Sequence, residues 1–340
     1  MELYAGIDLH STNSFVVITD ETDKEIYKKR LNNDARLILS ELEKYKGSIT
    51  GIAIESTYNW YWIVDCLQEN GYAVHLANTT AMQQYSGLKY TDDHSDAVWL
   101  AKLLRLKLLK EGHIYPKEKR GLREVLRRRM VLVRQQTASI LGIQSMLKRY
   151  ENVKLTGSKI KSGCGKKEEI LKYAKDESVR LALTAQLEVL SCLIKQIGLL
   201  EKNILSGVKK NDAFNLLKKV PGIGDVLATT ILLETGDIER FKSPGNYSSY
   251  CRCVGSKRIS NAKKKGENNR KNGNPYLGWA YVEAANYSIQ HYDVIKKYYQ
   301  RKLCKTKRVI ALKTIANKLS KACYFVLRDK VEFDMKKLFG

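Results

Sequence analysis

The chain has 340 residues, of which 44% are hydrophobic, and it carries a formal net charge of +24. Its length suffices for about two domains, and no stretch reaches the roughly 18 uninterrupted apolar residues of a membrane-spanning helix. The first residues, MELYAGIDLH, lack the basic region of a secretory signal, so we expect a cytoplasmic protein without a membrane partner.

The charge is divided unevenly along the chain. Residues 1–100 hold 8 Lys and Arg against 15 Asp and Glu, a net charge of −7, and the remaining residues have a net charge of +31. A basic surface of this size is typical of contact with phosphate backbones, because each contact releases condensed counterions. We therefore expect a nucleic-acid partner, in preference to an inert basic surface or a membrane-surface binder.

The first hundred residues follow strand and helix patterns in turn. Strands are predicted at residues 3–8, 14–19, 25–31, 49–54 and 73–77, and helices at residues 34–46 and 58–70. This order predicts an α/β domain, with helices on the faces of a mixed sheet.

From residue 97 onward the apolar spacing becomes helical. Two long helices are predicted, at residues 118–150 and from about 168 to 208, on either side of a Gly-, Ser- and Lys-rich break at residues 157–167. Together they indicate a helical hairpin or coiled-coil arm with a flexible tip. An all-α region is predicted from Asn211 to the end of the chain.

Four carboxylates stand at positions that suit a metal site. Asp8 ends the first strand, Glu55 ends a later one, and Asp93 and Asp96 share one face at the start of a helix. If the strands are neighbours and the helix packs across their ends, all four converge. Mg²⁺, or alternatively Mn²⁺, would bind such carboxylates and stabilise phosphoryl transfer. Each acid alone also suits a loop end or a helix cap, and spacing does not decide between Asp92 and Asp93.

Residues 220–224, VPGIG, separate two apolar helical stretches in the last region. This is the pattern of a helix–hairpin–helix unit. Gly222 and Gly224 allow backbone amides to approach a phosphate at the N-terminus of the next helix. The alternative is a plain turn between two packed helices.

The segment 255–273, GSKRISNAKKKGENNRKNG, combines dense positive charge with Ser256 and Ser260 on a Gly- and Asn-rich loop. A serine beside several cations can attack a phosphodiester, although most loop serines have no catalytic role. The basic residues of this segment that we expect to contact phosphate are Lys263, Lys264, Lys265, Arg270 and Lys271. Further candidates on the first long helix, where the alternative is a solvated face, are Arg127, Arg128, Arg129 and Arg134.

The order of these features resembles the DEDD transposases of bacterial insertion sequences, a family of bridge-RNA-guided DNA recombinases. The resemblance spans essentially the whole chain. In the first region it rests on AGID at 5–8, IEST at 54–57 and DHSDA at 93–97. In the last region it rests on PGIG at 221–224, GDI at 236–238 with Arg240 and Phe241, Ser260 with its basic tail, GNPYL at 273–277 and VEAA at 282–285.

The resemblance implies an RNase H-like (RuvC-type) domain at residues 1–112, a coiled-coil arm at 113–210 and a helical transposase domain at 211–340. It implies that Asp8, Glu55, Asp93 and Asp96 match a metal-binding acidic tetrad, and that Ser260 matches a serine nucleophile that forms a phosphoserine link with DNA.

The resemblance also implies a guide RNA transcribed from the element, and donor and target DNA as substrates. It implies an oligomer, a dimer or tetramer, in which the acidic and serine sites come from different subunits. The family serine is commonly followed by glycine, whereas Asn261 follows here. Because asparagine tolerates left-handed backbone geometry, we favour Ser260 over Ser256.

We therefore expect a DNA transposase that excises and integrates an insertion sequence by strand exchange. One alternative is a metal-dependent Holliday-junction resolvase or nuclease of the RuvC type, which needs the carboxylates and not the serine. Another is a non-catalytic nucleic-acid-binding protein in which the tetrad is incidental.

Overall fold

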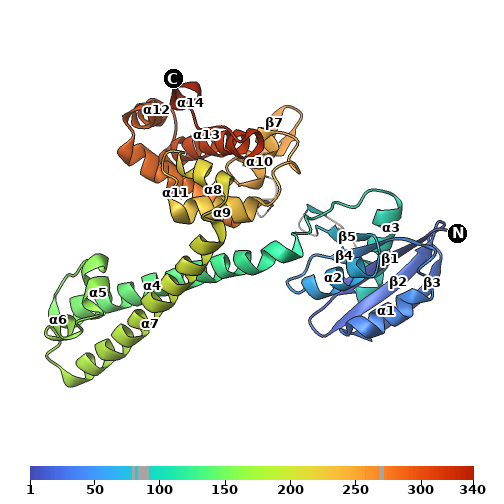
Figure 1. Cartoon of the computed structure of the whole chain (residues 1–340), viewed down its shortest axis with the longest axis horizontal. Helices are drawn as coiled ribbons and strands as arrows, with labels where there is room; N and C mark the ends of the chain where they lie inside the picture. The colour runs from blue at the N-terminus through green and yellow to red at the C-terminus, as the bar shows by residue number, and fades with distance from the viewer. Residues whose placement is uncertain (79–80, 83–91, 257, 268–271) are drawn as a thin grey trace. The chain divides into compact units, whose positions relative to one another are not determined.

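The computed structural model describes residues 1–78, 81–82, 92–256, 258–267 and 272–340 (Figure 1). These residues form two compact units. The first comprises Met1–Lys117 and Ser256–Asn272, and the second comprises Glu118–Gly255 and Gly273–Gly340.

A five-stranded mixed sheet forms the centre of the first unit, in the order β3-β2-β1-β4-β5. The first three strands are antiparallel, while β4 is parallel to β1 and β5 is parallel to β4. The elements are β1 Leu3–Leu9, β2 Asn13–Asp20, β3 Glu25–Asn32, α1 Ala35–Glu43, β4 Ile49–Glu55, α2 Tyr61–Glu69, β5 Val74–Ala77 and α3 Asp93–Arg105. The predicted order is confirmed, although α3 begins four residues before the predicted position.

Alternation along β1 sends its side chains to two faces of the sheet. The odd-numbered residues join a buried cluster with the apolar side chains of α1 and α2. The other face, to which Gly6 and Asp8 belong, is covered by α3, which packs on β1, β2 and β4. A Cβ at Gly6 would lie 1.9 Å from the backbone oxygen of Ala97. Glycine is therefore required at this position for α3 to approach the sheet.

Two long helices, α4 Lys117–Glu151 and α7 Glu177–Val208, lie side by side (Figure 1). Ile143 and Leu147 of α4 are buried in one cluster with Leu183 and Leu187 of α7, which confirms the predicted helical hairpin. By length and composition alone, α7 is the one helix of the described ranges that is long and apolar enough to cross a membrane. Its buried leucines pack within this hairpin.

The segment between the long helices was predicted as a flexible break, and that prediction is wrong. It contains α5 Gly157–Gly163 and α6 Glu168–Leu171. Ile160 and Ile170 are buried in the same cluster as the long helices, and Thr156 caps α5. The second long helix begins at Glu177, later than predicted, because the side chain of Asp176 accepts from the Val179 amide at its N-terminus.

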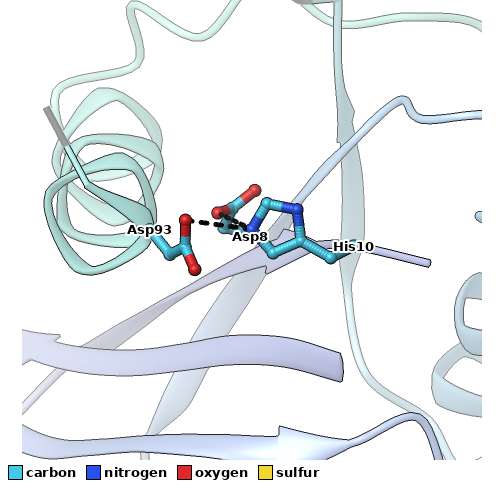
Figure 2. Close-up of side chains that lie close together, drawn as sticks. All are labelled: Asp8, His10 and Asp93. Carbon is cyan, nitrogen blue, oxygen red and sulfur yellow. Dashed lines mark ion pairs between the residues drawn. The ribbon is translucent and has the colours of Figure 1, made fainter. Parts of the chain in front are cut away.

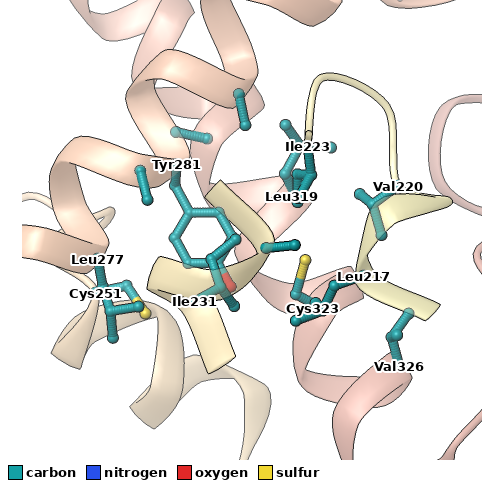
Figure 3. Close-up of a cluster of buried hydrophobic side chains, with 14 of the residues drawn as sticks. Leu217, Val220, Ile223, Ile231, Cys251, Leu277, Tyr281, Leu319, Cys323 and Val326 are labelled. Carbon is teal, nitrogen blue, oxygen red and sulfur yellow. The ribbon is translucent and has the colours of Figure 1, made fainter. Parts of the chain in front are cut away.

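The rest of the second unit is helical, as predicted. A buried apolar cluster that includes Leu217, Ile231, Tyr281 and Cys323 joins its helices (Figure 3). The helices are α8 Asp212–Lys218, α9 Asp225–Thr235, α10 Pro244–Tyr250, α11 Pro275–His291, α12 Asp293–Leu303, α13 Arg308–Asp329 and α14 Met335–Phe339. Between α10 and α11 lies the segment Ser256–Asn272, which belongs to the first unit and is called the excursion below.

That excursion carries a short antiparallel hairpin, β6 Arg258–Ser260 and β7 Lys263–Gly266. The sequence predicted a loop here. The difference arises at Asn261 and Ala262, which have φ values of 50° and 57°. Positive φ at both central residues produces the tight turn that lets two strands pair.

Candidate functional site

The predicted acids gather where β1 and β4 end beneath the first turn of α3. Asp8 is the second-last residue of β1, and Glu55 is the last residue of β4. The two strands are parallel neighbours, with Ile7 opposite Ile54, so their ends lie together. Glu55, through hydrogen bonding and charge, and Asp96, through its charge, both raise the pKa of the Asp8 carboxyl. The condition on which convergence depended, neighbouring strands crossed by a helix, is met.

His10 lies at the centre of this cluster and was not predicted. Its Nε2 atom is 3.1 Å from Asp8 Oδ2 and 3.1 Å from Asp93 Oδ1 (Figure 2). The carbonyl oxygen of His10 accepts hydrogen bonds from Asn33 and Asn59, which hold the chain just beyond β1. The signal was in the sequence, because a period of two places residues 8 and 10 on the same side of an extended chain.

Asp8 has the most strongly perturbed carboxyl of the cluster. Its exposed fraction is only 1%. Burial raises the pKa of Asp8 to about 7, with further contributions from the hydrogen bond and charge of Glu55 and from the charge of Asp96. The charge of His10 acts in the opposite direction and lowers this pKa. A nearby cation would reverse this balance by favouring the ionised form.

Asp92 and Asp93 have different roles in the structure. Asp92 is the N-cap of α3, and its side chain accepts from the Ser95 amide at 2.8 Å in a capping box. Asp93 faces the cluster, where it also accepts from Arg30 Nη2 at 2.6 Å. Since its carboxylate holds the helix end, Asp92 is the structural acid of the pair.

The donor set fits a divalent cation. Asp8, His10 and Asp93 each offer a ligand atom, and these atoms all lie within 4.8 Å of one another. Asp96 Oδ1 is buried without a hydrogen-bond partner within the described residues. A buried carboxylate oxygen in that state is costly unless a cation or water satisfies it. Oxygen-rich sites of this kind suit hard cations.

Ser260 is exposed at the end of β6, directly before the turn formed by Asn261 and Ala262. Its register partner is Lys263, the first residue of β7. The left-handed geometry that led us to favour Ser260 is present at Asn261. Ser256 lies outside the two strands.

The basic residues around Ser260 are only partly described. Lys263 and Lys265 are exposed on β7, and the backbone of Lys264 pairs with Ile259. Arg270 and Lys271 lie outside the described residues.

The two predicted glycines of the VPGIG turn differ in their surroundings. Gly222 has φ +78°, and a Cβ there would lie 2.2 Å from the backbone oxygen of Ala284 on α11. It is therefore needed for packing within the bundle. Gly224 is the N-cap of α9 and has open space beside it. Asp225, in the first turn of α9, pairs with Lys218 at 2.6 Å.

The predicted arginines of α4 also separate into two groups. Arg127 and Arg129 have acidic partners within the protein, Glu234 and Glu201, each at 2.6 Å. Arg128 pairs with Glu124 on the same exposed helix face, and Arg134 is exposed. Arg128 and Arg134 are thus the members of the set that remain open to a partner.

Family models of known proteins match the two regions of the chain that contain the candidate residues. A family model described as a transposase of the DEDD IS110 type matches residues 5–152, which contain the acidic cluster. A second, described as the transposase IS116/IS110/IS902 family, matches residues 214–300, which contain the serine hairpin. The chain belongs to the IS110-type insertion-sequence transposases. A comparison with curated proteins gave no match.

This membership defines the general activity of the transposase. It is a DNA-processing enzyme whose substrate is DNA, and its DEDD type implies that it uses a divalent metal ion. The acidic cluster around Asp8 provides oxygen ligands for such an ion.

Proposed function

We propose that this transposase excises and integrates its insertion sequence by DNA strand exchange, guided by a bridge RNA. In this proposal Asp8, Glu55, Asp93 and Asp96 hold Mg²⁺, or Mn²⁺, and Ser260 is the nucleophile. The observation that carries the proposal is the buried Asp8 carboxyl, which the fold places against Glu55 and near Asp96. Crowded carboxylates are unfavourable unless a cation compensates for them.

We interpret the first unit as an RNase H-like (RuvC-type) domain. The strand order β3-β2-β1-β4-β5, with three antiparallel strands followed by two parallel ones, is consistent with that fold. We likewise propose the functional segments 1–112, 113–210 and 211–340. When bound, the ion would stabilise the charge that develops on phosphate oxygens. The acids of the chain would hold it, while His10 and Arg30 would orient Asp93.

Ser260 supplies the covalent step of the proposal. Its Oγ atom attacks a phosphodiester, the Oγ–P bond forms, and the P–O bond to the leaving deoxyribose oxygen breaks. The serine proton passes to water, and the leaving oxygen gains a proton from water. A deoxyribose hydroxyl of the exchanged strand then attacks the phosphoserine and frees Ser260. The exposed position of Ser260 beside Lys263 supports this role, because cations favour the charged transition state.

The remaining partners follow from the charge and the resemblance. Donor DNA, target DNA and the guide RNA would contact the basic surfaces, including Lys263, Lys265, Arg128 and Arg134. The amide at Gly224 would approach a phosphate at the turn before α9, as in a helix–hairpin–helix unit. A dimer or tetramer would bring the serine of one subunit to the acids of another.

The test uses Asp8→Ala and Ser260→Ala in a strand-exchange assay with Mg²⁺, end-containing DNA and the RNA of the element. We expect both variants to lose exchange, and a mixture of the two to regain part of it through mixed oligomers. A fully active Ser260→Ala protein would favour a metal-only nuclease. A fully active Asp8→Ala protein would exclude the metal site.

A further inference from the structure

A carboxylate in the second unit, Glu234 of α9, is completely buried at its side chain. Arg127 of α4 donates to it from Nε at 2.6 Å and from Nη2 at 2.8 Å, and Arg123 donates at 3.1 Å. Burial alone would raise the pKa of Glu234, but the hydrogen bond of Arg127 and the charges of both arginines hold it below its usual value. Glu234 is therefore an ionised group inside the bundle.

Asn274 connects this buried charge to the point where the chain returns from the serine hairpin. Its Nδ2 atom donates to Glu234 at 2.8 Å. Its Oδ1 atom accepts from the amides of Tyr276 and Leu277, which caps α11, and its own amide donates to the Tyr250 carbonyl at 2.6 Å. The side chain of Asn274 thus joins α9 to α11, and its backbone amide joins the same point to the end of α10.

The residues that follow α10 and those that precede α11 are also hydrogen-bonded to each other. Arg252 Nε donates to the carbonyl oxygen of Gly273 at 3.2 Å. Gly273 has φ +87°, and a Cβ there would lie 2.4 Å from the Tyr250 oxygen. The ends of the excursion that carries Ser260 are therefore held at defined places on the bundle.

A hairpin of this size needs such an anchor. The strands β6 and β7 have three and four residues, and an isolated two-stranded hairpin is at best marginally stable in water. A buried ion pair contributes little net stability relative to apolar packing, but its geometry is specific. The pair of Arg129 with Glu201 differs, because Glu201 is partly exposed and the pair joins α4 to α7.

We propose that Glu234 is a positioning residue for Ser260. Together with Arg123, Arg127 and Asn274 it fixes the point at which the segment that carries the serine rejoins the helices of the second unit. The proposal rests on the nucleophilic role of Ser260, and it assigns Arg127 to this network and not to phosphate contact.

The experiment compares three variants of the full-length protein. Glu234→Gln removes the buried charge. Asn274→Ser keeps a side chain that can cap α11 but is too short to reach Glu234. Glu201→Gln is the matched control, because it breaks an arginine pair between α4 and α7. Each variant is assayed for covalent adduct with end-containing DNA, the RNA of the element and Mg²⁺, and for tryptic cleavage after Lys263 and Lys265.

We expect Glu234→Gln and Asn274→Ser to be cleaved faster in the hairpin and to form adduct about 100-fold more slowly, because misplacement of a reacting group by about 1 Å has such an effect. The DNA concentration for half-maximal rate should stay unchanged, since only positioning is lost. Glu201→Gln should resemble the unaltered protein in both assays.

Unchanged cleavage in folded Asn274→Ser protein would overturn the proposal, whatever happens to Glu234→Gln. The cleavage assay also separates this inference from the proposed function. If Ser260→Ala still formed adduct, the nucleophile would be wrong, yet faster cleavage in the two variants and not in the control would still support the anchor.

Discussion

The acidic cluster and the serine hairpin differ in how the fold holds them. Asp8 is buried at the end of a central strand, between a neighbouring strand and a helix that packs closely on Gly6. Ser260 is exposed on a three-residue strand, and contacts of Arg252 and Asn274 hold the chain on either side of its segment. The proposed metal site requires several ligands at fixed distances, whereas the proposed nucleophile must be accessible to DNA. The acidic cluster therefore depends on packing in the core of its unit, whereas Ser260 lies on an exposed short hairpin.

The largest effect should follow from Asp8→Asn, which keeps the shape of the side chain and removes its charge. We expect strand exchange to fall by about 1,000-fold or more, because the ion contributes several kcal/mol of transition-state stabilisation. Asp92→Asn is the control, since asparagine also caps helices. Equal losses of strand exchange in the two variants would contradict the different roles of Asp8 in the acidic cluster and of Asp92 as a helix cap.

The pKa of Asp8, raised to about 7, predicts how stability depends on pH without metal. Between an unfolded value near 3.8 and about 7, the folded state binds the proton more tightly, so stability falls as pH rises through this window. The loss is at most about 4 kcal/mol. Urea unfolding in EDTA at pH 5 and pH 8 measures it. Asp8→Asn should abolish the dependence, and Mg²⁺ should oppose it at pH 8.

Gly6→Ala tests whether packing of α3 holds the acidic cluster. The new methyl group would meet the Ala97 backbone, and overpacking of this kind destabilises by about 1–3 kcal/mol. Chemical denaturation should show the loss, and metal binding should weaken with it because α3 carries Asp93 and Asp96. Gly47→Ala, in the same unit, has open space around the new methyl group and is the matched control. Normal metal affinity in Gly6→Ala would show that the close packing of α3 on the sheet is not needed to hold the acidic cluster.

The smallest effect should come from Asp92→Ala, which removes the cap of α3. A lost N-cap costs about 1 kcal/mol. Thermal unfolding measures the change. Under conditions in which the variant is fully folded, its affinity for Mg²⁺ should remain near that of the unaltered chain. A loss of metal affinity as large as that of Asp93→Ala would show that Asp92 is a ligand and not only a cap.

Local patterns in the sequence predicted most of the first unit. The sequence pattern predicted that Asp8 and Glu55 lie at the ends of strands, because strand length and alternation depend on short-range geometry. The same alternation could have identified His10. Spacing could not decide between Asp92 and Asp93, since that choice depends on which way the first helical turn faces.

Long-range contacts explain what the sequence did not predict. Arg127 and Glu234 are 107 positions apart, and only the packed bundle shows that this arginine pairs with a buried acid.

The folded tip around Ile160 was not predicted because isolated apolar residues in a Gly- and Lys-rich segment gave no periodic signal. The hairpin was not predicted because alanine seldom adopts positive φ, so Ala262 gave no sign of a tight turn.

The most direct test of the account is to map the covalent protein–DNA adduct by mass spectrometry of tryptic peptides. The reaction would contain the full-length transposase, end-containing DNA, the RNA of the element and Mg²⁺. We expect a nucleotide linked through phosphate to Ser260, which is absent in Ser260→Ala and strongly reduced in Asp8→Asn or EDTA. An adduct at another residue, or efficient strand exchange by Ser260→Ala, would contradict it.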